Sequence, residues 1–177
     1  MIKEICLKEK GKDPIEIVKK MMHNPEVSIH GPEHHILDGA ALMTALHNGG
    51  MEFNLEEALD EMERRGCKMP GATCGQWGMC GSCSSVGAAV AIIRETGPLS
   101  GNEYYKDNLR ITSEALGRIA DVGGPRCCKR NAFLAISTAA EYMNEKYDAG
   151  LETGKITCEF SRLNKQCIKE RCPYYEG

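Results

Sequence analysis

The stretch that decides the fold is "GGPRCCKRNAFLAISTAAEYMNEKY", residues 123–147. Gly124-Pro125 is a helix-opening signal, because proline fits the first helical turn, where the backbone N–H has no partner to lose. The sequence therefore predicts a long helix through the rest of the stretch. Two adjacent cysteines, Cys127 and Cys128, fall in its first turn.

Five more helices are predicted outward from this one. They run from Asp13 to about His23, from Gly31-Pro32-Glu33 to Gly49-Gly50, from Asn54 to Gly66, through "SSVGAAVAIIRET" (84–96), and from Ser100 to about residue 122. The segment "IKEICLKE" (2–9) is the one candidate strand. The fold class expected is an all-α bundle of about six helices with an irregular, Cys-rich C-terminal tail. We expect residues 1–150 to form a helical metal-binding domain and residues 151–177 to pack on it.

Composition narrows the function classes. The net charge of −3 and a pI near 6.0 argue against generic nucleic-acid binding. No apolar run has the length of a membrane span, and the first residues lack the apolar core of a signal peptide, so we expect a cytoplasmic protein. The sequence is compatible with a homo-oligomer. In a reducing compartment, ten cysteines are more often metal ligands or redox and catalytic groups than disulfides.

The first cysteine group is "CGQWGMCGSC", residues 74–83. Cys74, Cys80 and Cys83 are candidate ligands, because thiolates bind soft metals and the glycines let the backbone fold closely around a bound group. Trp77 is expected to cover such a site and keep water away from it. The alternative is that some of these thiols are small buried hydrophobic side chains.

The second group is the tail "CEFSRLNKQCIKERCPYY", residues 158–175, with Cys158, Cys167 and Cys172. This polar segment has little apolar content, so it needs either docking or a metal to order it. Proline directly after the last cysteine is typical of bacterial iron–sulfur runs. Zinc is the competing metal, although zinc sites more often show two short Cys-x-x-Cys pairs. A disordered tail with incidental cysteines is the third reading.

The pair Cys127–Cys128 stands among the cations Arg126, Lys129 and Arg130. Free amides and positive charge in a first helical turn lower thiol pKa values and favour anions. Neighbouring helical positions point about 100° apart. One thiol can therefore bind a cluster while the other faces a substrate pocket or a second metal. The alternative for the three cations is an ordinary solvated surface.

A third motif, "HGPEHHILDGAAL" at residues 30–42, has the same Gly-Pro helix start. Glu33, His34 and His35 occupy the first turn. An imidazole there can bind a metal or move protons near neutral pH, with the carboxylate orienting it or acting as a base. The two Gly-Pro helix starts are expected to converge on one site.

The motifs "GPEHHIL", "CGQWGMCG", "GGPRCCKR" and a tail ending in "RCPYY" occur here in one order. In this the chain resembles an uncharacterised Cys-rich family of unknown function from anaerobic archaea and bacteria, whose domain also occurs joined to methyltransferase-like domains. The resemblance covers residues from about 28 onward and implies an anaerobic setting, which suits oxygen-sensitive clusters. The matching positions are Glu33, His34, His35, Cys74, Trp77, Cys80, Arg126, Cys127, Cys128, Lys129, Arg130, Cys158, Cys167 and Cys172.

We therefore expect one or two [4Fe-4S] clusters. The first is expected at Cys74 and Cys80 with one or both of Cys127 and Cys128, and the three tail cysteines supply a second cluster or complete the first site. An iron with an open position would bind substrate or sulfide, which indicates sulfur transfer or cluster-assisted lyase chemistry.

In that scheme Glu33 and His34 or His35 move protons, while Arg126 and Lys129 hold a small anionic or sulfur-containing substrate. Two alternatives stay open. One is a zinc–thiolate protein, structural or active in methyl transfer to sulfur, and the other is an electron-transfer module without catalysis. A redox protein or a methyltransferase is the expected partner.

Overall fold

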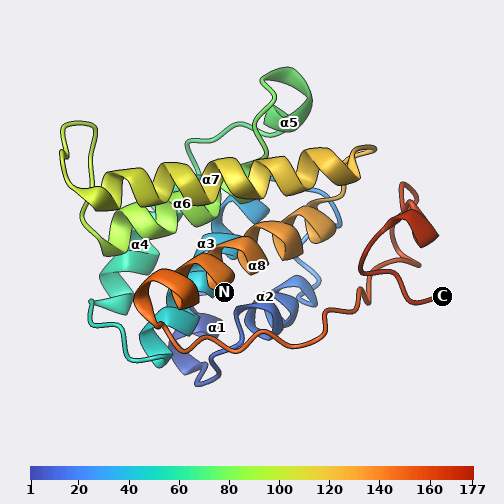
Figure 1. Cartoon of the computed structure of the whole chain (residues 1–177). Helices are drawn as coiled ribbons and strands as arrows, with labels where there is room; N and C mark the ends of the chain where they lie inside the picture. The colour runs from blue at the N-terminus through green and yellow to red at the C-terminus, as the bar shows by residue number, and fades with distance from the viewer.

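The computed structural model describes all residues 1–177 and contains helices and irregular segments but no strand (Figure 1). The elements are α1 Ile2–Lys8, α2 Pro14–Met22, α3 His34–Asn48, α4 Leu55–Gly66, α5 Thr73–Gln76, α6 Gly81–Ile93, α7 Glu103–Val122, α8 Cys128–Tyr147 and the 3-10 turn η1 Lys169–Arg171. The all-α prediction is confirmed, and all six predicted helices are present.

Two helices were not predicted, α1 and the short α5. The candidate strand at the N-terminus is α1 instead. Ile2, Ile5 and Cys6 stand three and four positions apart, which places them on one helical face, and they pack against the apolar core. None of the helices is long and apolar enough to cross a membrane.

Helix α3 lies at the centre of the bundle. Nearly all its residues from His34 to Leu46 are buried, and it packs against α1, α2, α4, α6 and α8. A helix that is apolar on every side has to be enclosed in this way. Gly39 allows the close approach of α6, because a Cβ there would stand 2.7 Å from the Ser85 carbonyl oxygen.

The long helices α7 and α8 lie side by side, with α6 against both (Figure 1). Helix α6 begins at Gly81, three residues before its predicted start, because Cys80 takes the N-cap position. Helix α7 begins at Glu103, where the Asn102 side chain accepts a hydrogen bond from Tyr105 N. Ser100 instead stabilises the preceding turn by accepting from Gly97 N.

Helix α8 begins at Cys128 rather than at Pro125, and Cys127 is its N-cap. The Cys127 Sγ accepts a hydrogen bond from Arg130 N at 3.5 Å, the bond that an N-cap side chain makes to a free amide of the first turn. The two adjacent cysteines therefore straddle the helix boundary.

The tail after α8 is irregular apart from η1, as predicted. It runs back along α8 and folds over the N-terminal end of that helix (Figure 1). Phe160 is buried beside His23 of α2, with ring centroids 4.9 Å apart, and Tyr174 packs edge-on against Phe133 of α8 at 5.5 Å. The chain end thus reaches the residues that the sequence marks for chemistry.

Candidate functional site

Two cavities lie at the start of α8, and each is lined by one of the two adjacent cysteines. The histidine cavity, of about 270 Å³, is lined chiefly by His30, His34, His35, Cys80, Arg126 and Cys128. The tail cavity, of about 20 Å³, is lined chiefly by Cys127, Lys129, Arg130, Cys158, Cys167 and Cys172. The pair therefore faces two different environments, as the geometry of neighbouring helical positions predicts.

The tail cavity brings together four thiols from two distant segments of the chain. Three of them accept backbone hydrogen bonds: Cys127 Sγ from Arg130 N at 3.5 Å, Cys167 Sγ from Lys169 N at 3.4 Å, and Cys158 from the amide of Phe160. Burial raises the pKa of Cys127 and of Cys158. These N–H donors would stabilise thiolates if the protons were displaced.

Two buried cations lie against the same four thiols. Lys129 is 0% exposed; its Nζ donates to the Ser28 carbonyl oxygen at 3.1 Å and lies 5.0 Å from the centre of the Phe160 ring. Burial lowers the pKa of Lys129. Arg130 is 2% exposed, donates to the carbonyl oxygens of Gly123 and Pro125, and keeps Nη1 without a partner.

All of these hydrogen-bond partners are uncharged, and neither cation forms an ion pair, although Asp38 and Glu33 lie near enough to raise the pKa of Lys129 against the effect of burial. A buried cation without an ion pair is expensive. The expected solvated surface applies only to Arg126, since Lys129 and Arg130 are enclosed.

The four thiols of the tail cavity line one small space of about 20 Å³. No three His, Cys, Asp or Glu side chains of the chain are arranged to hold a single metal ion. What the four thiols share is the cavity, the amide donors and the two cations.

The histidine cavity contains an acid–base pair on α3. His34 Nδ1 lies 3.4 Å from Asp38 Oδ1, and the two side chains are 1% and 0% exposed. His34 Nε2 and Asp38 Oδ2 have no hydrogen-bond partner. A carboxylate that accepts from Nδ1–H leaves the Nε2 lone pair free, so His34 can accept a proton in the cavity.

Cys80 lines the same cavity, and its sulfur is the acceptor of several hydrogen bonds. Its Sγ accepts from Cys83 and, at 3.4 Å, from Asn131 Nδ2. These bonds, that from Cys83 first, lower the pKa of Cys80 to about 6. The same bond and burial raise the pKa of Cys83. Cys74, from α5, also lines this cavity but is exposed.

His30 connects the two cavities. Its Nδ1 accepts from the backbone N–H of Cys128 at 3.4 Å, and its Nε2 lies 3.0 Å from Asn164 Oδ1. Asn164 Nδ2 in turn donates to Cys127 Sγ at 3.4 Å. Burial lowers the pKa of His30. A neutral imidazole with its proton on Nε2 satisfies both bonds, so one relay joins the start of α8 to the thiol of the tail cavity.

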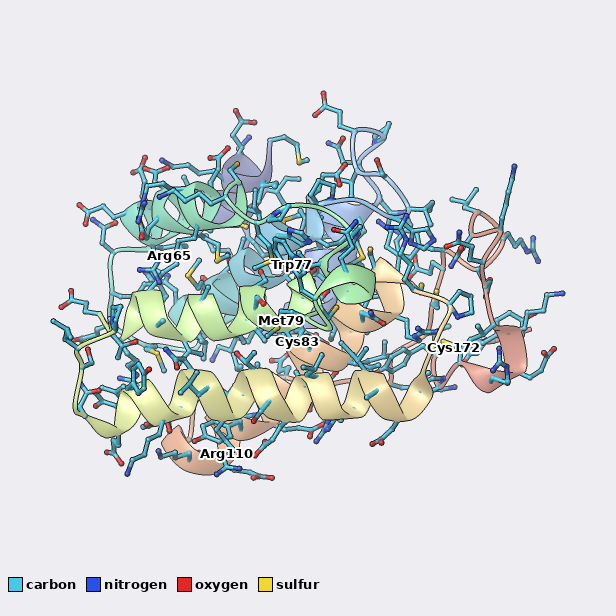
Figure 2. All side chains as sticks on the ribbon, turned by 90° about the horizontal axis from the view of Figure 1, so that it is seen from above. Arg65, Trp77, Met79, Cys83, Arg110 and Cys172 are labelled. Carbon is cyan, nitrogen blue, oxygen red and sulfur yellow. The ribbon has the colours of Figure 1, made fainter.

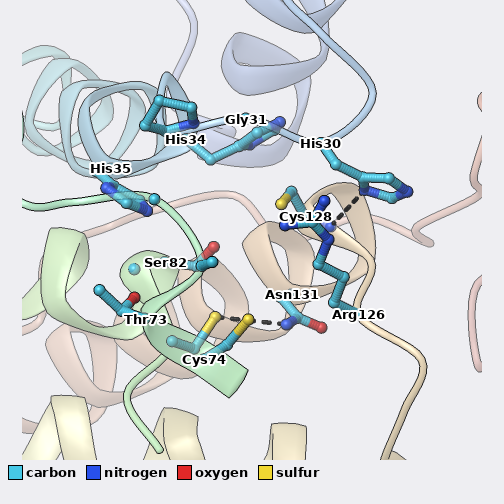
Figure 3. Close-up of a pocket in the computed structure, with 15 residues that line it drawn as sticks. His30, Gly31, His34, His35, Thr73, Cys74, Ser82, Arg126, Cys128 and Asn131 are labelled. Atoms are coloured by element: carbon cyan, nitrogen blue, oxygen red, sulfur yellow. Dashed lines mark hydrogen bonds between the residues drawn. The ribbon is translucent and has the colours of Figure 1, made fainter. Parts of the chain in front are cut away.

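His35 and Arg126 complete the histidine cavity from two sides (Figure 3). His35 Nδ1 lies 3.3 Å from the Met69 carbonyl oxygen, and its ring packs directly on Gly81, where a Cβ would stand 2.0 Å from Cδ2. Arg126 is exposed at the cavity wall. The cavity thus combines a thiol, imidazoles and a cation.

Several predicted site residues lie elsewhere. Glu33 is the N-cap of α3, where it accepts from Ser28 Oγ at 3.1 Å, and it lines neither cavity. Trp77 is 67% exposed and also lines neither cavity. Lys129 belongs to the tail cavity, whereas Arg126 belongs to the histidine cavity.

The cysteines divide in the same way. Cys127 faces the tail cavity, apart from Cys74 and Cys80, so the structure does not bring the predicted first ligand group together. Figure 2 shows the tail residue Cys172 well separated from Cys83, which is buried in α6. The thiols therefore form two groups rather than one.

The prediction from sequence missed four polar residues of the site: His30, Asp38, Asn131 and Asn164. Asp38 stands four positions after His34, and Asn131 three positions after Cys128, so helical spacing alone places each on the face of a predicted site residue. Asn164 carries no such signal, because its position depends on how the tail folds over α8.

The comparisons with known proteins cover the whole site. A family model described as "Family of unknown function (DUF5714)" matches residues 2–175, which include every helix, both cavities and all ten cysteines. No curated protein and no solved structure matches the chain.

Proposed function

The chain belongs to the DUF5714 family of unknown function, and from this premise we propose that it is an iron–sulfur protein. The proposed ligands of its [4Fe-4S] cluster are Cys127, Cys158, Cys167 and Cys172. The observation that carries the proposal is that these four thiols line one cavity together with two buried cations that form no ion pair.

Charge balance supports an anion in the tail cavity. A cluster bound by four thiolates is a net anion, because thiols must lose their protons to bind a metal. Lys129 and Arg130 would offset that charge, and the amide donors to three of the thiols would stabilise it further. In the metal-free chain neither cation has an ion pair to offset the cost of its burial.

The tail itself needs such a group. Between Asp148 and the C-terminus only Leu151, Phe160 and Asn164 are fully buried. So little buried surface does not offset the entropy of ordering the segment. Four bonds to one cluster would hold it against α8.

Iron–sulfur is favoured over zinc by the spacing of the ligands. The cysteines are separated by eight and four residues in the tail, without the short Cys-x-x-Cys pairs of most zinc sites, and Pro173 follows the last of them. Zinc with four thiolates is also an anion, so metal analysis has to separate the two.

The neighbouring histidine cavity is the proposed reaction site. Its volume of about 270 Å³ suits a small molecule, Arg126 would hold an anionic group, and His34 Nε2 would accept a proton while Asp38 orients the ring. The reaction class is sulfur transfer or cluster-assisted lyase chemistry, in an oxygen-sensitive cytoplasmic enzyme supplied with electrons by a redox partner.

The test is the iron, zinc and acid-labile sulfide content of protein purified without oxygen. Iron and sulfide in near-equal amounts, with the broad visible absorption of thiolate-bound iron, are expected. They should be lost in Cys158→Ser but kept in Cys67→Ser, which changes an exposed cysteine outside both cavities. A colourless protein with zinc and no sulfide, or one with no metal, would overturn the proposal.

A further inference from the structure

The start of α6 has a feature that the proposed cluster does not use. Cys80 is the N-cap of this 13-residue helix, and Cys83 lies in its first turn, so "CGSC" is a Cys-x-x-Cys sequence at a helix N-terminus. The two side chains are hydrogen-bonded to each other, with Cys83 as the donor. They stand three positions apart at the start of one helix, where side chains are neighbours, so the pair has the spacing that a Cys-x-x-Cys disulfide requires.

The surroundings distinguish the two thiols. Cys80 lines the histidine cavity and receives hydrogen bonds from Cys83 and from Asn131 Nδ2, whereas Cys83 is fully enclosed behind it. Hydrogen bonds to sulfur and the helix N-terminus favour a thiolate at Cys80. The lowered pKa of Cys80, about 6, agrees with this geometry. Cys80 is thus the activated thiol that faces the cavity, and Cys83 is the enclosed thiol behind it.

A second, independent observation points to a ligand at this place. His34 lines the same cavity, is 1% exposed, and keeps Nε2 without a partner. Arg126 lies on the cavity wall, and no carboxylate lines this cavity. A buried, unsatisfied imidazole nitrogen and a free cation on either side of a reactive thiol indicate a small substrate with an anionic group.

The other ionisable groups around the pair are few. Asp38 and His35 approach from α3, and Cys128 approaches from α8. Asp38 is a negative charge near Cys83 and opposes its ionisation, which keeps the proton on Cys83 until Cys80 has reacted.

We propose that Cys80 and Cys83 form a dithiol redox site that exchanges with a small anionic disulfide bound in the histidine cavity. This extends the proposed function, because it names a substrate class for the same cavity. It does not need the cluster, because none of the tail cysteines takes part.

The exchange has two steps. The Cys80 thiolate attacks one sulfur of the substrate, the substrate S–S bond breaks, and a mixed disulfide forms as the first half leaves as a thiolate. That thiolate takes the proton of Cys83. The Cys83 thiolate then attacks Cys80 Sγ and releases the second half as a thiolate. The cysteine pair loses two electrons and the substrate gains them, and thiols of the same class reverse the reaction.

The test uses the full-length protein, purified without oxygen and treated with oxidised glutathione at neutral pH. Remaining thiols are blocked, and the peptides are examined by mass spectrometry. The wild type should contain a Cys80–Cys83 disulfide. Cys83→Ala should accumulate glutathione on Cys80, and Cys80→Ala should show neither product. Cys67→Ala is the control and should behave as the wild type.

The anionic part of the substrate has its own test. Arg126→Met should slow the reaction with oxidised glutathione by about fivefold, the upper range for an exposed ion pair. It should leave the reaction with the uncharged hydroxyethyl disulfide unchanged. Equal slowing of both probes would overturn the anionic substrate.

Two outcomes would overturn the redox site. One is a disulfide from Cys80 to Cys74 or Cys128 instead of Cys83. The other is a wild-type alkylation profile of Cys80 without a midpoint near pH 6, which needs no variant to fold. The outcome is separable from the proposed cluster, because Cys127→Ser should lose iron and still form the Cys80–Cys83 disulfide.

Discussion

The tail cavity and the histidine cavity begin at the same dipeptide, yet their thiols differ in one respect: burial raises the pKa of Cys128, to about 11, as it does in the tail cavity, whereas the pKa of Cys80 is lowered. In the tail cavity, burial raises the pKa of Cys127 and Cys158, and the charges nearby are two enclosed cations that form no ion pair. In the histidine cavity, hydrogen bonds lower the pKa of Cys80 to about 6, and imidazoles stand beside it. Under the two proposals, the tail thiols would hold the cluster and Cys80 would be the reacting thiol.

The start of α8 thus contributes one cysteine to each of the two cavities. Adjacent positions at the start of α8 point apart, so Cys127 and Cys128 face separate cavities while His30 keeps the two connected. Changes in one cavity should therefore leave the chemistry of the other largely intact.

The largest effect is expected from Cys172→Ser. Without its last cysteine the tail should lose the proposed cluster and, with few buried side chains of its own, detach from α8. Proteolysis of residues 148–177 should accelerate at least about tenfold, because local opening exposes the segment. The helical circular dichroism should stay unchanged. A tail that remains as resistant as in the wild type would show that docking alone orders it.

Lys129→Met is expected to stabilise the metal-free protein but to be unfavourable to the charge balance of the cluster-loaded protein. In metal-free protein, removing an enclosed ammonium group that forms no ion pair should raise the free energy of unfolding by about 1 to 3 kcal/mol. In cluster-loaded protein the same change should lower the reduction potential by tens of millivolts, because a compensating charge is lost. Urea unfolding and redox titration measure the two effects. Destabilisation of the metal-free form would contradict the account.

A smaller effect, confined to the histidine cavity, is expected from Gly81→Ala. The new Cβ would meet the His35 ring at 2.0 Å, so the ring must move, at a cost of about 1 to 2 kcal/mol in stability. Gly75→Ala is the matched control in α5, because nothing lies within 4 Å of its added Cβ. Iron content should be unchanged in both. Equal stability of the two variants would mean that His35 is not held against α6.

The sequence predicted the bundle well because its signals are local. The Asp13 and Asn54 caps and the small-residue segment of α6 act within one helix turn or one helix face. The N-terminal helix α1 was missed because seven residues carry too little periodicity to separate helix from strand.

The site was predicted in its parts but not in its grouping. The motifs marked cysteines and histidines that line the two cavities, yet which thiols share a cavity depends on where the tail lies after α8, and no local pattern encodes that path. The enclosure of Lys129 and Arg130 has the same origin, since tail residues such as Phe160 cover them.

The most direct test of the division between the cavities is a matched pair of variants, Cys127→Ser and Cys128→Ser, each analysed for iron and sulfide after purification without oxygen. The account predicts that Cys127→Ser loses iron and sulfide, while Cys128→Ser retains both at the wild-type level. Loss of iron from Cys128→Ser, or full retention by Cys127→Ser, would contradict the assignment of the two thiols to separate tasks.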